Sequence, residues 1–338
     1  MNKEIKNKRP SQRSIARKVG ISVGAVSRAL SDDPLIALKT RELVKKTAVE
    51  MGYVPDRAAQ RLRTGRTSVI SLILPPHEEI LGFGTSLVRG ISSGLGHSRY
   101  HLVVMPDFSN ETADATVRRI VENGLADGVI LSRAEPNDIR IRYLLEHDFP
   151  FVSHGRTELA TPHPFVDFDN YDFAYQSVQK LLAKGANKLM ILLPPEHLTF
   201  CHHLRQGFIA AVREAGVAHE ELNEVTLDSE PHEITEVIRA RFSAPSPPNG
   251  LILPGDTSAL AAIAALSDIG CTPGRDVQLM IKQTSGVFGL VRPKVTSIFE
   301  DIAAAGELMA QYLIKRIDGS DAKQLQFIQG VEESRHDG

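Results

Sequence analysis

Apolar positions recur at helical spacing along the first part of the chain and predict short helices there. Ser11 can cap the first helix, because its hydroxyl can accept a hydrogen bond from a free backbone amide. Ile15, Ala16 and Val19 form one apolar face. Gly20 follows, and glycine commonly ends helices because it adopts the left-handed conformation at low cost. The pattern therefore predicts a helix that stops at about residue 20.

Two more helices follow at close spacing. The second is predicted over residues 23–30, where Ser22 can cap it, and the third over residues 39–51, where Gly52 ends it. Two short helices joined by a turn that contains glycine form a helix-turn-helix motif. Helices this short bury only a small core, so this segment is predicted to be a compact head.

After Thr67 the pattern changes to apolar runs of strand length that alternate with helical segments. The predicted strands are residues 69–74, 101–105, 128–131, 150–153, 188–193, 250–253 and 277–281. The predicted helices are residues 86–95, 112–123, 138–146, 203–214 and 258–269. This alternation predicts parallel sheets with helices on both faces, and its restart at residue 188 predicts two α/β lobes. A ligand cleft is expected at the carboxyl ends of the strands.

Charge is unevenly distributed between these two parts. Residues 1–68 contain 16 Lys and Arg against 6 Asp and Glu, a net charge of +10, whereas the remaining residues contain 23 and 35, a net charge of −12. Such an asymmetry indicates a head that binds a polyanion and a body that avoids one. A basic tail that is merely solvated is the alternative.

Cysteine usage and hydropathy indicate the compartment. Cys201 and Cys271 are far apart and lack the spacing of a structural zinc site, which fits a reducing environment. The first ten residues are polar and charged, and no run of about 20 apolar residues occurs, so neither a secretory signal nor a membrane span is predicted. We therefore expect a cytoplasmic protein without a metal or cofactor.

The second helix of a helix-turn-helix unit places its N-terminal part in the major groove. Arg28 can form a bidentate contact with guanine, Val23 can touch a thymine methyl, and Gly24 allows close approach of the backbone. Neighbouring serine hydroxyls suit phosphate oxygens, which fix position but not sequence. The candidate residues for these contacts are Ser11, Arg13, Ser22, Val23, Gly24, Ala25, Ser27, Arg28 and Ser31. In the alternative interpretation, the serines only cap helices and Arg28 is solvated.

Residues 14–30 (SIARKVGISVGAVSRAL), followed at matching spacing by residues 40–42 (TRE) and 51–55 (MGYVP), resemble the head of the lactose-repressor/galactose-repressor (LacI/GalR) family. Ala37 departs from the Ser or Thr that usually caps the third helix in that family. The resemblance implies a sequence-specific DNA-binding regulator that acts as a homodimer on a roughly palindromic operator.

Residues 55–66 fit a short hinge helix, which is marginal alone because nucleation costs more than so few residues return. The resemblance implies that it orders against DNA and the partner's identical helix, with Leu62 wedged into the minor groove beside Ala59. Gln60 stands where many members have arginine. The candidate residues for minor-groove contact are Arg57, Ala59, Gln60, Leu62 and Arg63.

Several body segments are similar to the effector domain of the same family, which has the fold of periplasmic sugar-binding proteins. They are residues 87–91 (LVRGI), 126–131 (ADGVIL), 169–170 (DN), 206–208 (QGF), 255–256 (GD) and 292–297 (RPKVTS). The resemblance thus implies a DNA-binding domain over 1–54, a hinge over 55–66, and an effector-binding and dimerisation domain over 67–338. Lobe one is expected over about 67–166 and 296–322, and lobe two over about 167–295 and 323–338. No leucine heptads follow Ile317, so a dimer is expected rather than a tetramer.

Polar and aromatic side chains near the strand ends are the candidates for effector binding. Arg156 can bind two hydroxyls or a carboxylate through its planar guanidinium, and Asp256 can accept hydrogen bonds from sugar hydroxyls. Phe83 matches an aromatic residue that lines the family's cleft, and Asp169 either binds a hydroxyl or orients the crossing between lobes. The complete set of candidates is Phe83, Arg156, Asp169, His203, Arg205, Asp256, Lys282 and Gln283.

Two positions of the effector domain depart from the family pattern. Leu204 stands where the family often has arginine, and a ligand-binding aspartate of the family is absent beside Lys282. A lysine there indicates an anionic effector, unless Gln283 and Thr284 provide a different set of hydrogen bonds to a neutral sugar. The neutral sugar is the expectation because it is the commoner class.

Other classes of protein are less consistent with the sequence. Gly82 and Gly84 precede a helix as in dinucleotide-binding enzymes, but Leu87 replaces the third glycine. An exported sugar-transport protein is opposed by the basic head. We expect a non-enzymatic repressor of sugar-related genes that a carbohydrate effector releases from its operator by a population shift. A corepressor, whose binding favours the ordered hinge, remains the alternative.

Overall fold

The structure, a computed structural model, describes residues 10–53, 65–75, 80–96, 98–107 and 112–331. The chain separates into two compact units, residues 1–67 and 68–338. The division falls where the apolar pattern of the sequence changes from helical segments to alternating strands and helices.

The described residues of the first unit form α1 (Gln12–Val19), α2 (Val23–Leu30) and α3 (Leu38–Glu50), close to the predicted bounds. Gly20 adopts a left-handed φ of 80° between α1 and α2, a conformation that residues with side chains rarely take. One small apolar core joins the three helices and consists of Ile15, Ala16, Val26, Ala29, Val44 and Ala48. The helix-turn-helix head predicted from the sequence is therefore confirmed.

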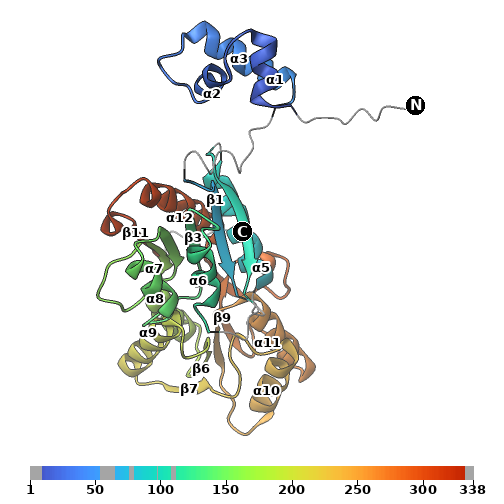
Figure 1. Ribbon diagram of the computed structural model, residues 1–338. Helices are drawn as coiled ribbons and strands as arrows, with labels where there is room; N and C mark the ends of the chain where they lie inside the picture. The colour runs from blue at the N-terminus through green and yellow to red at the C-terminus, as the bar shows by residue number, and fades with distance from the viewer. Residues whose placement is uncertain (1–9, 54–64, 76–79, 97, 108–111, 332–338) are drawn as a thin grey trace, which may run out of the picture. The chain divides into compact units, whose positions relative to one another are not determined.

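The second unit contains two parallel sheets (Figure 1). The first has the order β11-β5-β4-β3-β1-β2 and consists of β1 (Val69–Leu74), β2 (His101–Pro106), β3 (Gly128–Leu131), β4 (Phe151–His154), β5 (Phe165–Phe168) and β11 (Gln326–Gln329). The second has the order β10-β9-β8-β6-β7 and consists of β6 (Lys188–Leu192), β7 (Ala218–Leu222), β8 (Gly250–Leu253), β9 (Gln278–Gln283) and β10 (Thr296–Phe299). The predicted two-lobed α/β fold is confirmed.

Helices cover both faces of each sheet. Those of lobe one are α5 (Ile80–Leu95), α6 (Ala115–Glu122), α7 (Ile139–Glu146) and α12 (Ile302–Ile317). Those of lobe two are α8 (Asn170–Ala183), α9 (Thr199–Ala215), α10 (Pro231–Ser243) and α11 (Asp256–Asp268). No helix among the described residues combines the length and the apolar character needed to cross a membrane.

Strand alternation explains how one sheet supports two helical layers in lobe two. Leu189 and Ile191 of β6 pack in the core shared with α8 and α9, whereas Met190 and Leu192 pack in the core shared with α10 and α11. Figure 1 shows these two helix pairs on opposite sides of the sheet. Successive side chains of a strand point to opposite faces, so a continuous apolar run is buried on both.

The predicted lobe boundaries are wrong at three strands. Residues 296–299, expected in lobe one, form β10 and pair with β9 in the second sheet. Residues 326–329, expected in lobe two, form β11 and pair with β5 in the first sheet. The expected boundary at residue 166 also falls inside β5. Each of these strands has four residues, too few for a periodic pattern that would indicate its partner.

Two glycines allow helices to pack at very short range. A Cβ atom at Gly90 of α5 would lie 2.0 Å from the carbonyl oxygen of Ala303 at the start of α12. A Cβ atom at Gly207 of α9 would lie 2.1 Å from the carbonyl oxygen of Tyr171 in α8. Both glycines belong to segments that carry the family resemblance, and their role in the structure is close packing of helix backbones.

Candidate functional site

The first unit presents one exposed face of α2. Val23, Gly24 and Arg28 are exposed, with Val23 at 42%, whereas Val26 and Ala29 of the same helix are buried in the core of the head. An exposed valine at the start of a helix is free to contact an apolar group of a partner. The three residues predicted to read bases therefore lie on the side of α2 that the head itself leaves uncovered.

The serines of the head make hydrogen bonds within it. The Ser22 hydroxyl accepts the amide of Ala25 at 3.1 Å, and Ser11 caps α1 in the same way. The Ser31 hydroxyl donates to the Ser27 carbonyl at 2.9 Å. A capping hydroxyl that accepts a hydrogen bond keeps its own proton for donation. Capping and contact with a phosphate oxygen are thus compatible for the two capping serines.

The hinge residues Arg57, Ala59, Gln60, Leu62 and Arg63 lie outside the described residues, so their helix remains a prediction. Gly65, which follows them, adopts a left-handed φ of 69°. Glycine adopts this left-handed conformation at low cost.

A cleft lies between the two lobes at the carboxyl ends of strands from both sheets, as predicted for an α/β fold. Lobe one lines it with Phe83, Arg133, Ala134, His154, Gly155, Arg156 and Asp167. Lobe two lines it with Thr199, Phe200, Leu227, Pro254, Gly255, Asp256, Lys282 and Thr284, and Asn170 and Glu300 lie where the chain crosses between the lobes.

Arg156 follows β4 and pairs with Asp167 at the end of β5, with 3.4 Å between Nε and Oδ2. Burial raises the pKa of the Asp167 carboxyl to about 6, although the charge of Arg156 acts to lower it. Arg156 also lies 3.5 Å from His203 Nδ1 on α9 of lobe two. Burial, together with the charge of Arg156, lowers the pKa of His203 to about 4, so its imidazole is neutral at pH 7. Arg156 therefore contacts groups of both lobes.

Asp256 approaches the same cleft from lobe two. It is 7% exposed, and its carboxylate accepts hydrogen bonds from the amide of Thr284 at 3.1 and 3.2 Å and from the Thr284 hydroxyl at 3.0 Å. Gly82 of α5 lies opposite, since a Cβ atom there would be 2.6 Å from Asp256 Oδ2. The structure thus brings Phe83, Arg156 and Asp256 to one cleft, as predicted for an effector site.

Lys282 lines the cleft, and neighbouring groups of the protein compensate its charge. Its ammonium is 2.7 Å from Glu300 Oε2 and donates to Asn170 Oδ1 at 2.8 Å. It also lies over the rings of Phe168 and Phe200, at 5.2 and 5.6 Å from their centroids. His154 Nε2 is 3.6 Å from the other Glu300 oxygen, and burial lowers the pKa of that imidazole. A buried ammonium is stable only with such partners.

Four of the predicted effector-binding residues lie outside the cleft lining. Gln283 donates to the Ser297 hydroxyl at 2.7 Å, because strand alternation directs it away from the side on which Lys282 lies. Arg205 forms ion pairs with Glu196 and Glu221 within lobe two. Asp169 caps α8, which agrees with its alternative role of orienting the crossing between lobes. His203 contacts Arg156 but is likewise absent from the lining.

The sequence did not identify several lining residues. Arg133 and Asp167 occur at or just after the ends of β3 and β5, so the rule that selected Arg156 could have selected them. Asn170 is adjacent to Asp169, which was the residue predicted to bind the effector. Glu300 directly follows β10 and was missed because that strand was not predicted.

Comparison with known proteins identifies both units. The family of bacterial regulatory proteins, lacI family, matches residues 13–56, and the family of periplasmic binding proteins and the sugar-binding domain of the LacI family matches residues 67–319. The HTH-type transcriptional regulator AglR of Rhizobium meliloti (strain 1021) is 32% identical over 313 residues, which cover 89% of this chain and 86% of AglR.

Solved structures share the fold. The lac repressor dimer bound to operator and the anti-inducer ONPF has a TM-score of 0.80 at 19% identity, covering 96% of this chain and 97% of its own. The complex of the regulator CelR with cellobiose has a TM-score of 0.68 at 24% identity, covering 95% and 97%. The solved structures share the fold, whereas the two family models and the match to AglR show the family: the chain belongs to the LacI family of bacterial regulatory proteins.

Proposed function

We propose that this regulator represses sugar-related genes from a roughly palindromic operator and is released when a neutral carbohydrate binds the cleft. The charge balance of the cleft carries this proposal. Among the described lining residues, Arg156 faces Asp167, Lys282 faces Glu300, and Arg133 forms an ion pair with Asp228. A neutral sugar can hydrogen-bond to such groups without removing the partner of any charge, whereas an anion would compete with the carboxylates already present.

Aromatic and acidic groups of the cleft suit the same ligand. Phe83 and Phe200 are half-buried in the lining from opposite lobes and offer apolar faces to the C–H groups of a sugar ring. The Asp256 carboxylate and the Arg156 guanidinium offer acceptors and donors to its hydroxyls. The structure of the CelR complex contains cellobiose, a neutral sugar, in a protein of the same fold.

Release from DNA would follow from a shift in population. The effector favours closed lobes, the two hinge helices then separate, and the two heads lose their spacing on the operator. This requires a homodimer, which agrees with the dimeric lac repressor structure and with the two-fold symmetry of an operator. The protein would act in the cytoplasm, where its DNA target lies. A corepressor would instead stabilise the ordered hinge.

Thermal-shift screening of neutral sugars, sugar acids and sugar phosphates tests the proposal, with binding to an operator selected from random DNA measured beside each hit. We expect a neutral mono- or disaccharide to raise the melting temperature and to weaken operator binding. Stabilisation by sugar acids or phosphates alone would contradict the neutral ligand. Tighter operator binding with the sugar would identify a corepressor.

A further inference from the structure

A turn at the carboxyl end of β3 reaches from lobe one to lobe two. This turn, residues 132–135, is called the bridging turn below. The Ala134 carbonyl accepts a hydrogen bond from the amide of Thr199, the first residue of α9 in lobe two, at 3.0 Å. The Arg133 guanidinium forms an ion pair with Asp228, in the segment between β7 and α10. The bridging turn thus joins the lobes through a backbone hydrogen bond and an ion pair.

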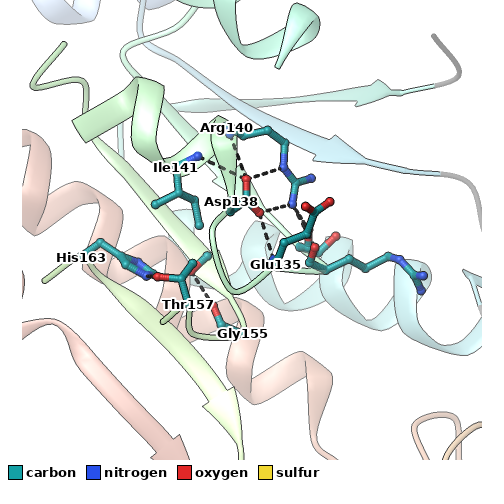
Figure 2. A network of polar contacts seen from close by, with 10 residues as sticks. Glu135, Asp138, Arg140, Ile141, Gly155, Thr157 and His163 are labelled. Atoms are coloured by element: carbon teal, nitrogen blue, oxygen red, sulfur yellow. Dashed lines mark hydrogen bonds and ion pairs between the residues drawn. The ribbon is translucent and has the colours of Figure 1, made fainter. Parts of the chain in front are cut away.

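A buried ion pair within lobe one holds the bridging turn. Arg140 donates to the carbonyls of Ser132 at 3.3 Å and Arg133 at 2.9 Å, and also to the Asp138 carboxylate. Asp138 accepts the amide of Glu135 at 3.2 Å, so the two ends of the turn are tied to one ion pair (Figure 2). The side chains of Asp138 and Arg140 are 1% and 8% exposed, and each is satisfied mainly by the other and by this backbone.

The backbone of Arg133 needs this support. Its φ is +57°, in the left-handed region that costs energy for a residue with a Cβ atom. Arg140 donates a hydrogen bond to the carbonyl of this residue, and the Arg133 guanidinium reaches Asp228 of lobe two. The side chain of Arg133 is 13% exposed, which leaves it little freedom to adopt other rotamers.

Asp228 is equally well positioned in lobe two. Its amide donates to the Thr226 hydroxyl at 3.2 Å, and the Thr226 amide donates to the Ser229 hydroxyl at 3.0 Å. The neighbouring Leu227 is buried, and its amide bonds to the Leu193 carbonyl at the end of β6. The Arg133–Asp228 pair therefore joins two ordered turns, so little side-chain entropy is lost when it forms, unlike an ordinary surface pair.

We propose that Arg133 and Asp228 form a latch that stabilises the closed lobes, and that the Asp138–Arg140 pair positions this latch. The proposal rests on the effector-driven lobe closure proposed above and names residues that set its equilibrium. A latch of this kind raises the closed population before any ligand binds, and the apparent affinity for the effector rises in proportion. Arg140 acts through Arg133 and is a positioning residue.

Hydrogen exchange of the Thr199 amide tests the latch in the full-length protein without ligand, because this amide is protected by a hydrogen bond across the lobes. Arg133→Gln and Asp228→Asn should each accelerate its exchange roughly two- to fivefold, the effect of losing one ion pair. The Thr199 exchange rate of the double variant should be only slightly higher than that of either single variant. Unchanged exchange in the single variants, or a double effect equal to the product of the singles, would overturn the latch.

Arg140→Lys tests the positioning role, since lysine keeps the charge but cannot donate to Asp138 and two carbonyls through one planar fork. It should accelerate Thr199 exchange in the wild-type background and have no added effect with Asp228→Asn. A structural defect alone would instead accelerate α7 and Thr199 amides equally in both backgrounds, and that result would refute positioning. The matched control is Arg239→Gln, which breaks an ion pair with Asp268 inside lobe two and should leave Thr199 unchanged. No sugar is needed, so failure of the latch is distinct from failure of the proposed effector.

Discussion

The Lys282 ammonium lies 2.7 Å from the Glu300 carboxylate, and the two side chains are 6% and 5% exposed. Lys282 is on β9 of lobe two, whereas Glu300 and Asn170, its other hydrogen-bond partner, lie at crossings between the lobes. The lysine therefore connects a strand of lobe two to two segments at which the chain crosses between the lobes. The lysine that suggested an anionic effector in the sequence is neutralised by the protein itself.

Lys282→Met should destabilise the second unit by about 3–5 kcal/mol, because it leaves the Glu300 carboxylate buried without its cation. The double variant Lys282→Met with Glu300→Gln should recover part of this loss, since no unpaired charge then remains. Denaturant unfolding of the full chain measures both. A double variant as unstable as the single would show that the charge of Glu300 is not the cause.

The Lys282–Glu300 contact also shows where prediction from the sequence ends. Long apolar runs such as residues 69–74 and 250–253 identified their strands, because a buried parallel strand needs such a run whatever its neighbours are. The four-residue strand β10 has no such signal, and its position in the second sheet depends on pairing with β9. Because β10 was not predicted, Glu300 could not be placed at the cleft, and the sequence did not identify it as the partner of Lys282.

The candidate site residues divide in the same way, into those that a local strand pattern identifies and those whose position depends on tertiary contacts. Arg156 and Asp256 were predicted because each comes shortly after a recognisable strand, and the structure places both in the cleft lining. Gln283 was one residue out of phase, since strand alternation places its neighbours Lys282 and Thr284 in the lining instead. Arg205 was predicted to bind the effector, but its guanidinium forms ion pairs with Glu196 and Glu221. These pairs depend on tertiary contacts that no local sequence pattern shows.

Gly90→Ala should destabilise lobe one by several kcal/mol, because its Cβ atom would lie 2.0 Å from the Ala303 carbonyl oxygen and α5 would have to move away from α12. Gly289→Ala is the matched control, since nothing lies within 4 Å of a Cβ atom there. Thermal unfolding compares the two variants. Equal melting temperatures would mean that the α5–α12 contact tolerates the extra methyl group.

The raised pKa of the Asp167 carboxyl predicts a specific dependence of stability on pH. Its pKa is raised from the usual 3.8 to about 6, so the folded state favours the protonated carboxyl. The stability from this group is therefore fully present below about pH 3.8 and is lost as the pH rises through 6. Asp167→Asn cannot ionise, so its melting temperature relative to wild type should rise between pH 4 and pH 7. A difference that is constant across this range would contradict the raised pKa.

Arg28→Ala should cost about 1–3 kcal/mol at one operator position and relax base preference there, because a bidentate contact to a base discriminates by that amount. Binding to a panel of single-base operator variants measures this. The matched control is Arg13→Ala on α1, which should weaken binding to operator and random DNA alike if it only contacts phosphate. Equal losses on operator and random DNA for Arg28→Ala would exclude base reading.

Arg156→Ala and Asp256→Ala should each leave operator binding intact and raise the effector concentration for half-release roughly ten- to hundredfold. The two side chains line the cleft from opposite lobes, and removing either leaves polar groups of a bound sugar unpaired, at about 1–3 kcal/mol. Arg205→Ala is the matched control, because its guanidinium is occupied by two carboxylates within lobe two and lies outside the lining. Operator release is titrated with the sugar that emerges from the screen. If Arg205→Ala alters the response as strongly as Arg156→Ala, or if neither Arg156→Ala nor Asp256→Ala alters it, the effector binds elsewhere than in this cleft.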